Sequence, residues 1–243
     1  MTPDRVAEWR AREDLAACSR LLVFREILDY SGHVSARLPE KPDRVLIQPR
    51  DSSRAALRAE ELLVVDLEGT VISGDGPPPV ELEIHLGVYR ARPDVNMVCH
   101  GHPTLSTSFS MSTARFLPMR HFAYKYGEGL AIHPDPTHIR TRQQGEAVAA
   151  TLGSADACLL RSHGTVVVAE SMPELLMNCL DLEENARTQL IAGQVGELVP
   201  LDAEEIRMID DSYSLSGHRA NKLWNHVTFL ARAAGVFDDP QGG

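Results

Sequence analysis

The chain lacks the features that would connect it to nucleic acids or to a membrane. Its 243 residues carry 24 basic and 34 acidic side chains, a formal net charge of −10, and no strongly basic block. Attraction to phosphate backbones or anionic membranes is therefore disfavoured. No apolar run approaches the ~20 residues that span a bilayer, and the N-terminus has no hydrophobic signal region. We expect a cytoplasmic protein that binds neither nucleic acid nor membrane.

Cysteine is also sparse. The four cysteines have neither Cys-x-x-Cys spacing nor the density of a disulfide scaffold: Cys18, Cys99, Cys158 and Cys179. We expect all four to be reduced core residues. With 43% hydrophobic residues, the chain is long enough for one substantial core. We expect a single domain over 1–243, in which 200–243 forms a C-terminal helical extension.

Hydrophobic periodicity and turn signals predict an alternation of helices and short strands. The predicted helices cover 4–29, 80–92, 104–111, 137–152, a long segment that begins at a Ser171/Glu174 capping box, and 203–234. The predicted strands cover 45–48, 62–67, 70–73, a run through His100, 157–161 and 165–169. A hairpin turn at 66–69 favours antiparallel pairing.

One short motif points to chemistry. His100 and His102 are separated by one residue and follow the apolar run 95–99. Because side chains alternate along a strand, both imidazoles face the same side and form a clamp for a metal, provided that other ligands arrive from elsewhere. Glu81 and His163 are the candidates. The alternative is a pair of surface histidines or hydrogen-bonded core histidines.

Five motifs follow one another between about residues 10 and 195: Gly32-His33-Val34-Ser35-Ala36-Arg37, the run 62–69, Glu81-x-x-x-His85 with 89–95, His100-Gly101-His102-Pro103, and the run 159–164. In this order they resemble the class II aldolase/adducin family. The resemblance implies an α/β fold with three layers, α/β/α, around a mixed, mainly antiparallel sheet. It also implies one divalent metal ion per subunit, Fe²⁺, Mn²⁺, Zn²⁺ or Co²⁺, held by His100, His102, His163 and Glu81, with Glu81 doubling as acid and base.

Departures from the sugar-phosphate aldolases indicate a different substrate. Those aldolases surround a phosphate with small donors in Gly-Asn-x-Ser, Thr-x-Ser-Gly-type and Ser-Ser segments, whereas this chain has His33 in the first and Arg50 in the second. An arginine fork suits a planar carboxylate. We expect a small carboxylate substrate bound by Arg50 and Arg54, with His33 and Ser35 nearby. The alternative for the two arginines is an exposed basic pair on a loop.

The runs 47–55 and 118–121 resemble the branch of the family that decarboxylates hydroxylated aromatic dicarboxylates. We therefore expect a lyase of aromatic catabolism, a metal-dependent decarboxylase of a dihydroxyphthalate-like compound that acts through an enolate-type intermediate. The candidate proton donors are Glu81, His121 and Tyr124. For His121 and Tyr124, the alternative is a loop that only covers the site.

Two other functions stay open: an aldolase that acts on a hydroxy-acid or sugar-derived substrate, and a non-catalytic interaction module like the adducin head. The resemblance further implies a homo-oligomer, a tetramer or larger, with the active site at a subunit boundary. In such an assembly the C-terminal helical region reaches a neighbouring site, and His218 is our candidate for a substrate contact there. A packing role is the alternative for His218.

Overall fold

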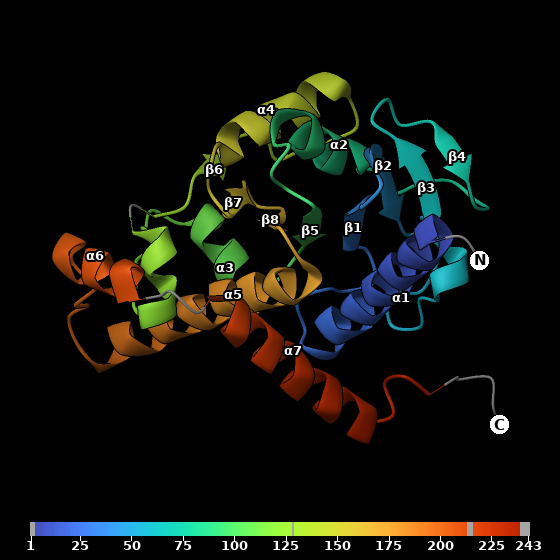
Figure 1. Cartoon of the computed structure of the whole chain (residues 1–243). Coiled ribbons are helices and arrows are strands. Elements are labelled where there is room, and N and C mark those ends of the chain that lie inside the picture. The colour runs from blue at the N-terminus through green and yellow to red at the C-terminus, as the bar shows by residue number, and fades with distance from the viewer. Residues whose placement is uncertain (1–2, 128, 213–215, 239–243) are drawn as a thin grey trace.

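The computed structural model describes residues 3–127, 129–212 and 216–238, in which one sheet lies between two layers of helices (Figure 1). The strands are β1 (His33–Leu38), β2 (Lys41–Ile47), β3 (Leu63–Asp66), β4 (Val71–Ser73), β5 (Met97–Gly101), β6 (Ile132–His133), β7 (Ala157–Leu160) and β8 (Gly164–Ala169). The helices are α1 (Pro3–Phe24), α2 (Leu82–Ala91), α3 (Thr104–Ser108), α4 (Arg142–Leu152), α5 (Met172–Val195), α6 (Ala203–Ser212) and α7 (Ser216–Ala233). Three 3₁₀ helices are η1 (Ala59–Glu61), η2 (Phe109–Met111) and η3 (His121–Tyr126).

The eight strands follow the order β4-β3-β2-β1-β5-β8-β7-β6. Each pair of neighbours is antiparallel except β6 and β7, which run parallel. In the middle of the sheet, His33 of β1 pairs with His100 of β5, and Gly101 pairs with Thr165 of β8. The prediction of a three-layer α/β fold around a mixed, mainly antiparallel sheet is confirmed.

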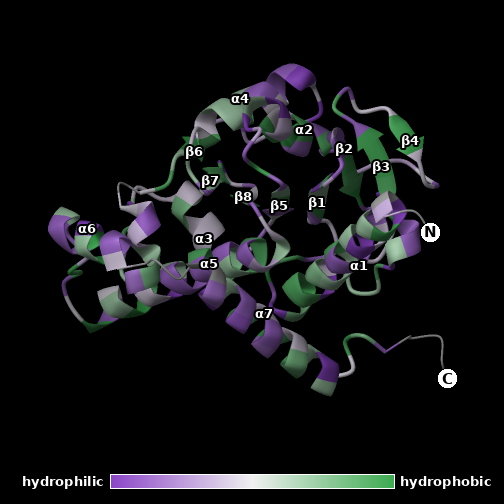
Figure 2. Ribbon diagram, viewed as in Figure 1, coloured by the Kyte–Doolittle hydropathy of each residue, from purple (hydrophilic) through white to green (hydrophobic). Residues whose placement is uncertain are grey.

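Each face of the sheet has its own hydrophobic core. Val98 of β5 packs in the core beneath α2 and α4, whereas Cys99 packs in the core beneath α1 and α5. Strand β3 contributes to both cores and is strongly hydrophobic in Figure 2. His100, two residues after Val98, therefore faces the α2 side, and Cys99 points away from it. All four cysteines are free and buried, as predicted.

Two helix boundaries differ from the prediction. Helix α1 ends at Phe24 instead of extending to Asp29, because the chain turns at Glu26, whose φ is 60°. Helix α4 begins at Arg142 instead of Thr137. Asp135 Oδ1 accepts hydrogen bonds from the N–H and the hydroxyl of Thr137, and this local turn competes with the first helical turn. Residues 134–141 therefore form a loop and not a helix.

Three further expectations need correction. Helix α5 begins at Met172, but the Ser171 side chain accepts no capping hydrogen bond, so the predicted capping box is absent. The helical region predicted over 203–234 is two helices, α6 and α7. The first predicted strand is 45–48, whereas the structure already has β1 at His33–Leu38, where polar and apolar residues alternate as in a half-buried strand.

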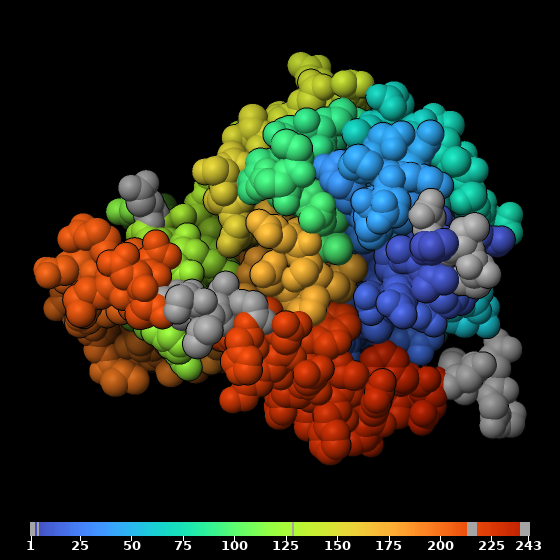
Figure 3. Space-filling view, in the orientation of Figure 1, coloured from blue at the N-terminus to red at the C-terminus, as the bar shows by residue number. Residues whose placement is uncertain are grey.

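The two C-terminal helices differ in how they pack. Val227 and Ala231 of α7 are buried in the core that α1 and α5 share. Figure 3 shows α7 on the outside of the molecule, against α5 and α1. None of the α6 residues is buried, and α6 packs against η3. In the described part of the chain, no helix is long and apolar enough to cross a membrane.

Candidate metal centre

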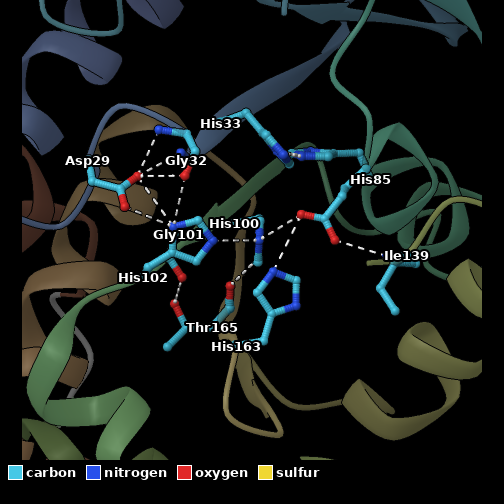
Figure 4. A network of polar contacts seen from close by, with 12 residues as sticks. Asp29, Gly32, His33, His85, His100, Gly101, His102, Ile139, His163 and Thr165 are labelled. Carbon is cyan, nitrogen blue, oxygen red and sulfur yellow. Dashed lines mark hydrogen bonds and ion pairs between the residues drawn. The ribbon is translucent and has the colours of Figure 1, made fainter. Parts of the chain in front are cut away.

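Two histidines at the end of β5 form one half of the candidate site. His100 belongs to the strand, and His102 lies just beyond it. Their rings point toward each other, with the two Nε2 atoms 3.2 Å apart (Figure 4). The alternation of the strand thus brings the two imidazoles together on one side of the sheet.

The other half comes from two distant segments. His163 lies in the turn between β7 and β8, and Glu81 is the N-cap residue of α2. Glu81 Oε2 lies 3.4 Å from His163 Nε2 and 3.6 Å from His100 Nε2. Four ligand atoms at about 2.1 Å from a tetrahedral cation lie ~3.4 Å from one another. The three spacings above match this value, and His100, His102 and His163 offer ligand atoms that all lie within 4.8 Å of one another, so these donors fit a divalent cation.

Hydrogen bonds to the outer ring nitrogens support that fit. His100 Nδ1 donates to the carbonyl of Thr165 at 2.9 Å, and His102 Nδ1 donates to the carboxylate of Asp29 at 3.1 Å, so we assign the Nδ1–H tautomer to both (Figure 4). Burial lowers the pKa of His100, which keeps this ring neutral. Two Nε2 lone pairs then face each other across 3.2 Å, and a cation between them removes their repulsion.

Glycines allow the ligand segments to approach this closely. A Cβ atom at Gly164 would lie 2.4 Å from the carbonyl oxygen of Gly101 and 2.9 Å from a ring carbon of His102. A larger residue next to His163 would therefore push β8 away from β5. Gly101 and Gly164, which follow His100 and His163, therefore allow β5 and β8 to lie close enough for the two histidines to meet.

Glu81 is anchored by one oxygen and faces the histidines with the other. Its Oε1 accepts the backbone N–H of Ile139 at 2.9 Å. Burial acts to raise the pKa of Glu81, but the contacts with His100 and His163 and the Ile139 N–H outweigh burial and hold the pKa below its ordinary value. The side chain is thus a carboxylate at neutral pH, which is the state that binds a cation.

A pocket of about 290 Å³ has Glu81 in its wall and collects positive charge. Its lining residues come from four separate segments: Tyr30, Ser31, His33, Arg50, Arg54, Pro79, Val80, Glu81, His138 and Arg140. Glu81 is the only acidic residue in that lining. Arg50 is exposed at the mouth, and among the described residues no carboxylate pairs with its guanidinium.

Arg54 plays a different part from Arg50. It is 7% exposed, and its guanidinium donates to the carbonyls of Gly32, Arg50 and Ser52. Arg54 therefore fixes the backbone of the loop that carries Arg50. Arg54 also lines the pocket, so its predicted contact with the substrate stays a prediction, with Nε and Nη1 already donating to backbone carbonyls.

His33 lines the pocket, but Ser35 lies behind it. His33 Nδ1 and His85 Nε2 are 2.7 Å apart, and Ser35 Oγ lies 2.6 Å from His85 Nδ1 and 2.8 Å from the Tyr89 hydroxyl. Ser35 and His85 are completely buried. The expected substrate contact of Ser35 is therefore corrected: its hydroxyl orients His85, which in turn orients His33.

Three predicted site residues lie away from the cluster. His121 and Tyr124 belong to η3, and Tyr124 lines a different cavity, next to Asp181 of α5. His218 is exposed on α7. None of the three lines the pocket around Glu81, so a role for them in the reaction requires a second copy of the chain.

Sequence reasoning missed several residues of the site. Asp29 and the Thr165 carbonyl orient the histidines, and His138 and Arg140 line the pocket. The rings of His138 and His163 lie 5.9 Å apart between centroids. The only available signal was the cluster of His138 and Arg140 in a segment rich in turn residues, and the prediction of a helix from Thr137 obscured it.

The fold and the histidine–glutamate cluster place the chain among α/β proteins with side chains spaced for a metal ion. The comparison with family models is more specific, because the model described as Class II Aldolase and Adducin N-terminal domain matches residues 13–190. The chain therefore belongs to the class II aldolase and adducin family.

Known relatives include both decarboxylases and aldolases. The chain is 26% identical over 240 residues to a 3,4-dihydroxyphthalate decarboxylase of Arthrobacter keyseri, covering 92% of this chain and 95% of the relative. It is 29% identical over 180 residues to an L-fuculose phosphate aldolase of Methanococcus vannielii, covering 72% and 93%. An aldolase II superfamily protein of Pseudomonas syringae has the same fold, with a TM-score of 0.84, 24% identity and coverage of 97% and 96%.

Proposed function

We propose that this protein is a divalent-metal-dependent decarboxylase of a hydroxylated aromatic dicarboxylate. The observation that carries the proposal is the pocket next to the histidine cluster, in which arginine side chains occupy the wall. Guanidinium groups match planar carboxylates through paired hydrogen bonds. The similarity to a 3,4-dihydroxyphthalate decarboxylase over nearly the whole chain supports the same substrate class.

A cation held by His100, His102, His163 and Glu81 would supply Lewis acidity and stabilise negative charge on substrate oxygens. The Arg50 guanidinium binds a substrate carboxylate at the pocket mouth. The bond between the ring carbon and the departing carboxylate breaks, carbon dioxide leaves, and the electron pair stays with the ring. Glu81 Oε2, ionised before the substrate binds, would accept the proton of the substrate's ring hydroxyl and then pass it to the ring carbon that has lost the carboxylate, while the Ile139 N–H holds Oε1 in place.

Aldol cleavage is the second candidate. The same metal ligands serve both reactions, since each leaves an electron pair beside an oxygen. The similarity to an L-fuculose phosphate aldolase supports aldol cleavage. The two reactions differ in their products: decarboxylation releases carbon dioxide without an aldehyde, whereas aldol cleavage releases an aldehyde and an enolisable ketone fragment. A non-catalytic module of the adducin type would bind no divalent metal.

The test is a product screen on protein loaded anaerobically with Fe²⁺, Mn²⁺, Zn²⁺ or Co²⁺. We expect about one metal ion per chain and release of carbon dioxide from ortho-hydroxy aromatic dicarboxylates. His163→Ala should lose the metal, and Glu81→Gln should lower kcat by about 10²- to 10⁴-fold, the usual contribution of a general acid or base. Glu68→Gln, in the exposed turn between β3 and β4, is the control for both measurements. Release of an aldehyde instead of carbon dioxide would contradict decarboxylation and support aldol cleavage.

We also infer that the working unit is a homo-oligomer of at least four copies. Two of our candidate proton donors, His121 and Tyr124, lie on η3 away from the cluster of their own chain. In an oligomer with sites at subunit boundaries, η3 and α7 of one copy would complete the pocket of another. We further propose that 1–243 is one domain, because α7 shares its core with α1 and α5.

A further inference from the structure

The loop 134–141 brings a second cation to the pocket. Arg140 is exposed and lines the same pocket as Arg50, although the two residues are 90 positions apart in the chain and belong to different segments. Among the described residues, no carboxylate lies within ion-pair distance of the Arg140 guanidinium. By contrast Arg142, two residues later, is paired with Glu146 at 2.9 Å. Arg140 therefore carries a charge that the protein itself does not neutralise.

The backbone on both sides of Arg140 is fixed. The N–H of Ile139 donates to Glu81 Oε1 at 2.9 Å, and the Ile139 side chain is completely buried. The N–H of Arg140 donates to Gln144 Oε1 at 2.9 Å, and Thr141 caps α4. These contacts tie the position of Arg140 to Glu81 through a single intervening residue. The backbone at Arg140 is therefore ordered before a ligand binds, and only the side chain has to be immobilised.

The charges of the pocket identify the class of ligand. Three arginines line it against one acidic residue, and Glu81 faces the histidine cluster with its second oxygen. Arg54 donates through Nε and Nη1 to three backbone carbonyls, whereas the guanidinium groups of Arg50 and Arg140 make no hydrogen bond to the described residues, so these two are the ones most available to a ligand. A substrate with one carboxylate would leave one of them without an acceptor. A ligand with two anionic groups would satisfy both.

We propose that Arg140 determines specificity by binding the second carboxylate of a dianionic substrate, with Arg50 binding the first. The inference rests on the proposed function, in that it places the substrate in the pocket beside Glu81. It adds a requirement that the metal ligands do not impose: the substrate must carry two acid groups that reach arginines from separate loops. His138, on the same loop, also lines the pocket, with its ring centroid 5.9 Å from that of His163.

The experiment measures binding and needs no turnover. Metal-loaded protein is titrated calorimetrically with phthalate, a dicarboxylate, and with benzoate, a monocarboxylate of the same ring size. We expect wild-type protein to bind phthalate at least tenfold more tightly than benzoate. Arg140→Gln should raise the Kd of phthalate by about 10- to 100-fold, as for loss of a charged hydrogen-bond pair, and that of benzoate by less than about threefold.

Two matched variants complete the design. Arg142→Gln removes the same charge from the same segment and should leave both Kd values within about twofold, which controls for net charge. Arg140→Lys should recover part of the phthalate affinity, because it restores charge without the fork. Equal weakening of both ligands by Arg140→Gln, unchanged phthalate binding, or a wild type that does not distinguish the ligands would overturn the proposal. Failure to release carbon dioxide would instead count against the proposed reaction and leave these ratios unaffected.

Discussion

Each histidine of the site uses its two ring nitrogens for different purposes. At His100 and His102 the outer nitrogen donates to a fixed acceptor, and the inner nitrogen faces the neighbouring ligands. At His33 one nitrogen contacts His85, which is itself held by Ser35. The orientation of these three rings thus depends on residues that do not line the pocket, whereas the outer nitrogen of His163, Nδ1, is buried without a hydrogen-bond partner among the described residues.

The buried histidines predict a stability that depends on pH. Burial, followed by repulsion from His100, lowers the pKa of His85 to about 3, whereas a histidine in the unfolded chain titrates near 6.5. Between these values the unfolded state binds a proton that the folded state does not, so stability is lost as pH falls below about 6.5. At pH 5, His85 alone should cost the metal-free protein about 2 kcal/mol relative to pH 7.5. Urea unfolding at both pH values measures this difference.

Two variants separate the titration of His85 from its packing. His85→Gln should reduce the drop in unfolding free energy between pH 7.5 and pH 5. Ser35→Ala removes a hydrogen bond but leaves the imidazole buried, so it should cost about 1–3 kcal/mol at both pH values and keep the pH dependence. An unchanged pH dependence in His85→Gln would show that other groups are responsible.

At the scale of elements, the site depends on the contact between α2 and α4. Glu81 precedes α2, and the loop before α4 supplies the Ile139 N–H that holds it. The helices touch through glycines: a Cβ atom at Gly87 would lie 2.3 Å from the carbonyl oxygen of Gly145. Because that obstacle is backbone, the helices themselves must separate to accept a side chain.

Gly87→Ala is therefore expected to lower the free energy of unfolding by about 1–3 kcal/mol and to weaken metal retention, because α4 and its preceding loop move away from Glu81. Gly193→Ala is the control, since its Cβ atom would meet only Leu198, at an ordinary 3.7 Å, and alanine favours the α5 helix. Denaturant unfolding and metal content are measured on both. Equal stability of the two variants would show that the α2–α4 contact adapts without cost.

The elements also show where sequence reasoning succeeds. Strand alternation and the position of His163 between two strands depend on local pattern, and both agree with the structure. The predictions for strand β1 and for the loop 134–141 do not agree with the structure. The polar face of β1 is buried by contacts with segments distant in sequence, such as that of Ser35 with His85 of α2, and the loop meets Glu81 58 positions away. No local pattern reports such contacts, so Arg140 and the orienting role of Ser35 emerged only with the fold.

At the scale of the whole molecule, charge and apolar surface are unevenly distributed. The chain has a net charge of −10, yet the pocket beside Glu81 is lined by three arginines. An anionic substrate is thus attracted locally and not by the molecule as a whole.

Several large apolar side chains are also exposed on the C-terminal half of the chain: Val195, Val199, Met208 and Phe229 are 85%, 84%, 66% and 70% exposed. Exposed apolar side chains mark a covered surface only where they gather into one patch, so each of them has to be tested by substitution.

Phe229 offers a test of the proposed assembly. It lies on α7 opposite the face that buries Val227 and Ala231, so a substitution there leaves the core intact. We expect light scattering on wild-type protein to give at least four times the chain mass of 26.7 kDa. Phe229→Glu should shift the mass toward smaller species, because burying a carboxylate against an apolar partner is costly, whereas Phe229→Leu should retain the assembly. A wild-type mass of one chain would rule out the oligomer, and with it the participation of η3 and α7 in a neighbouring site.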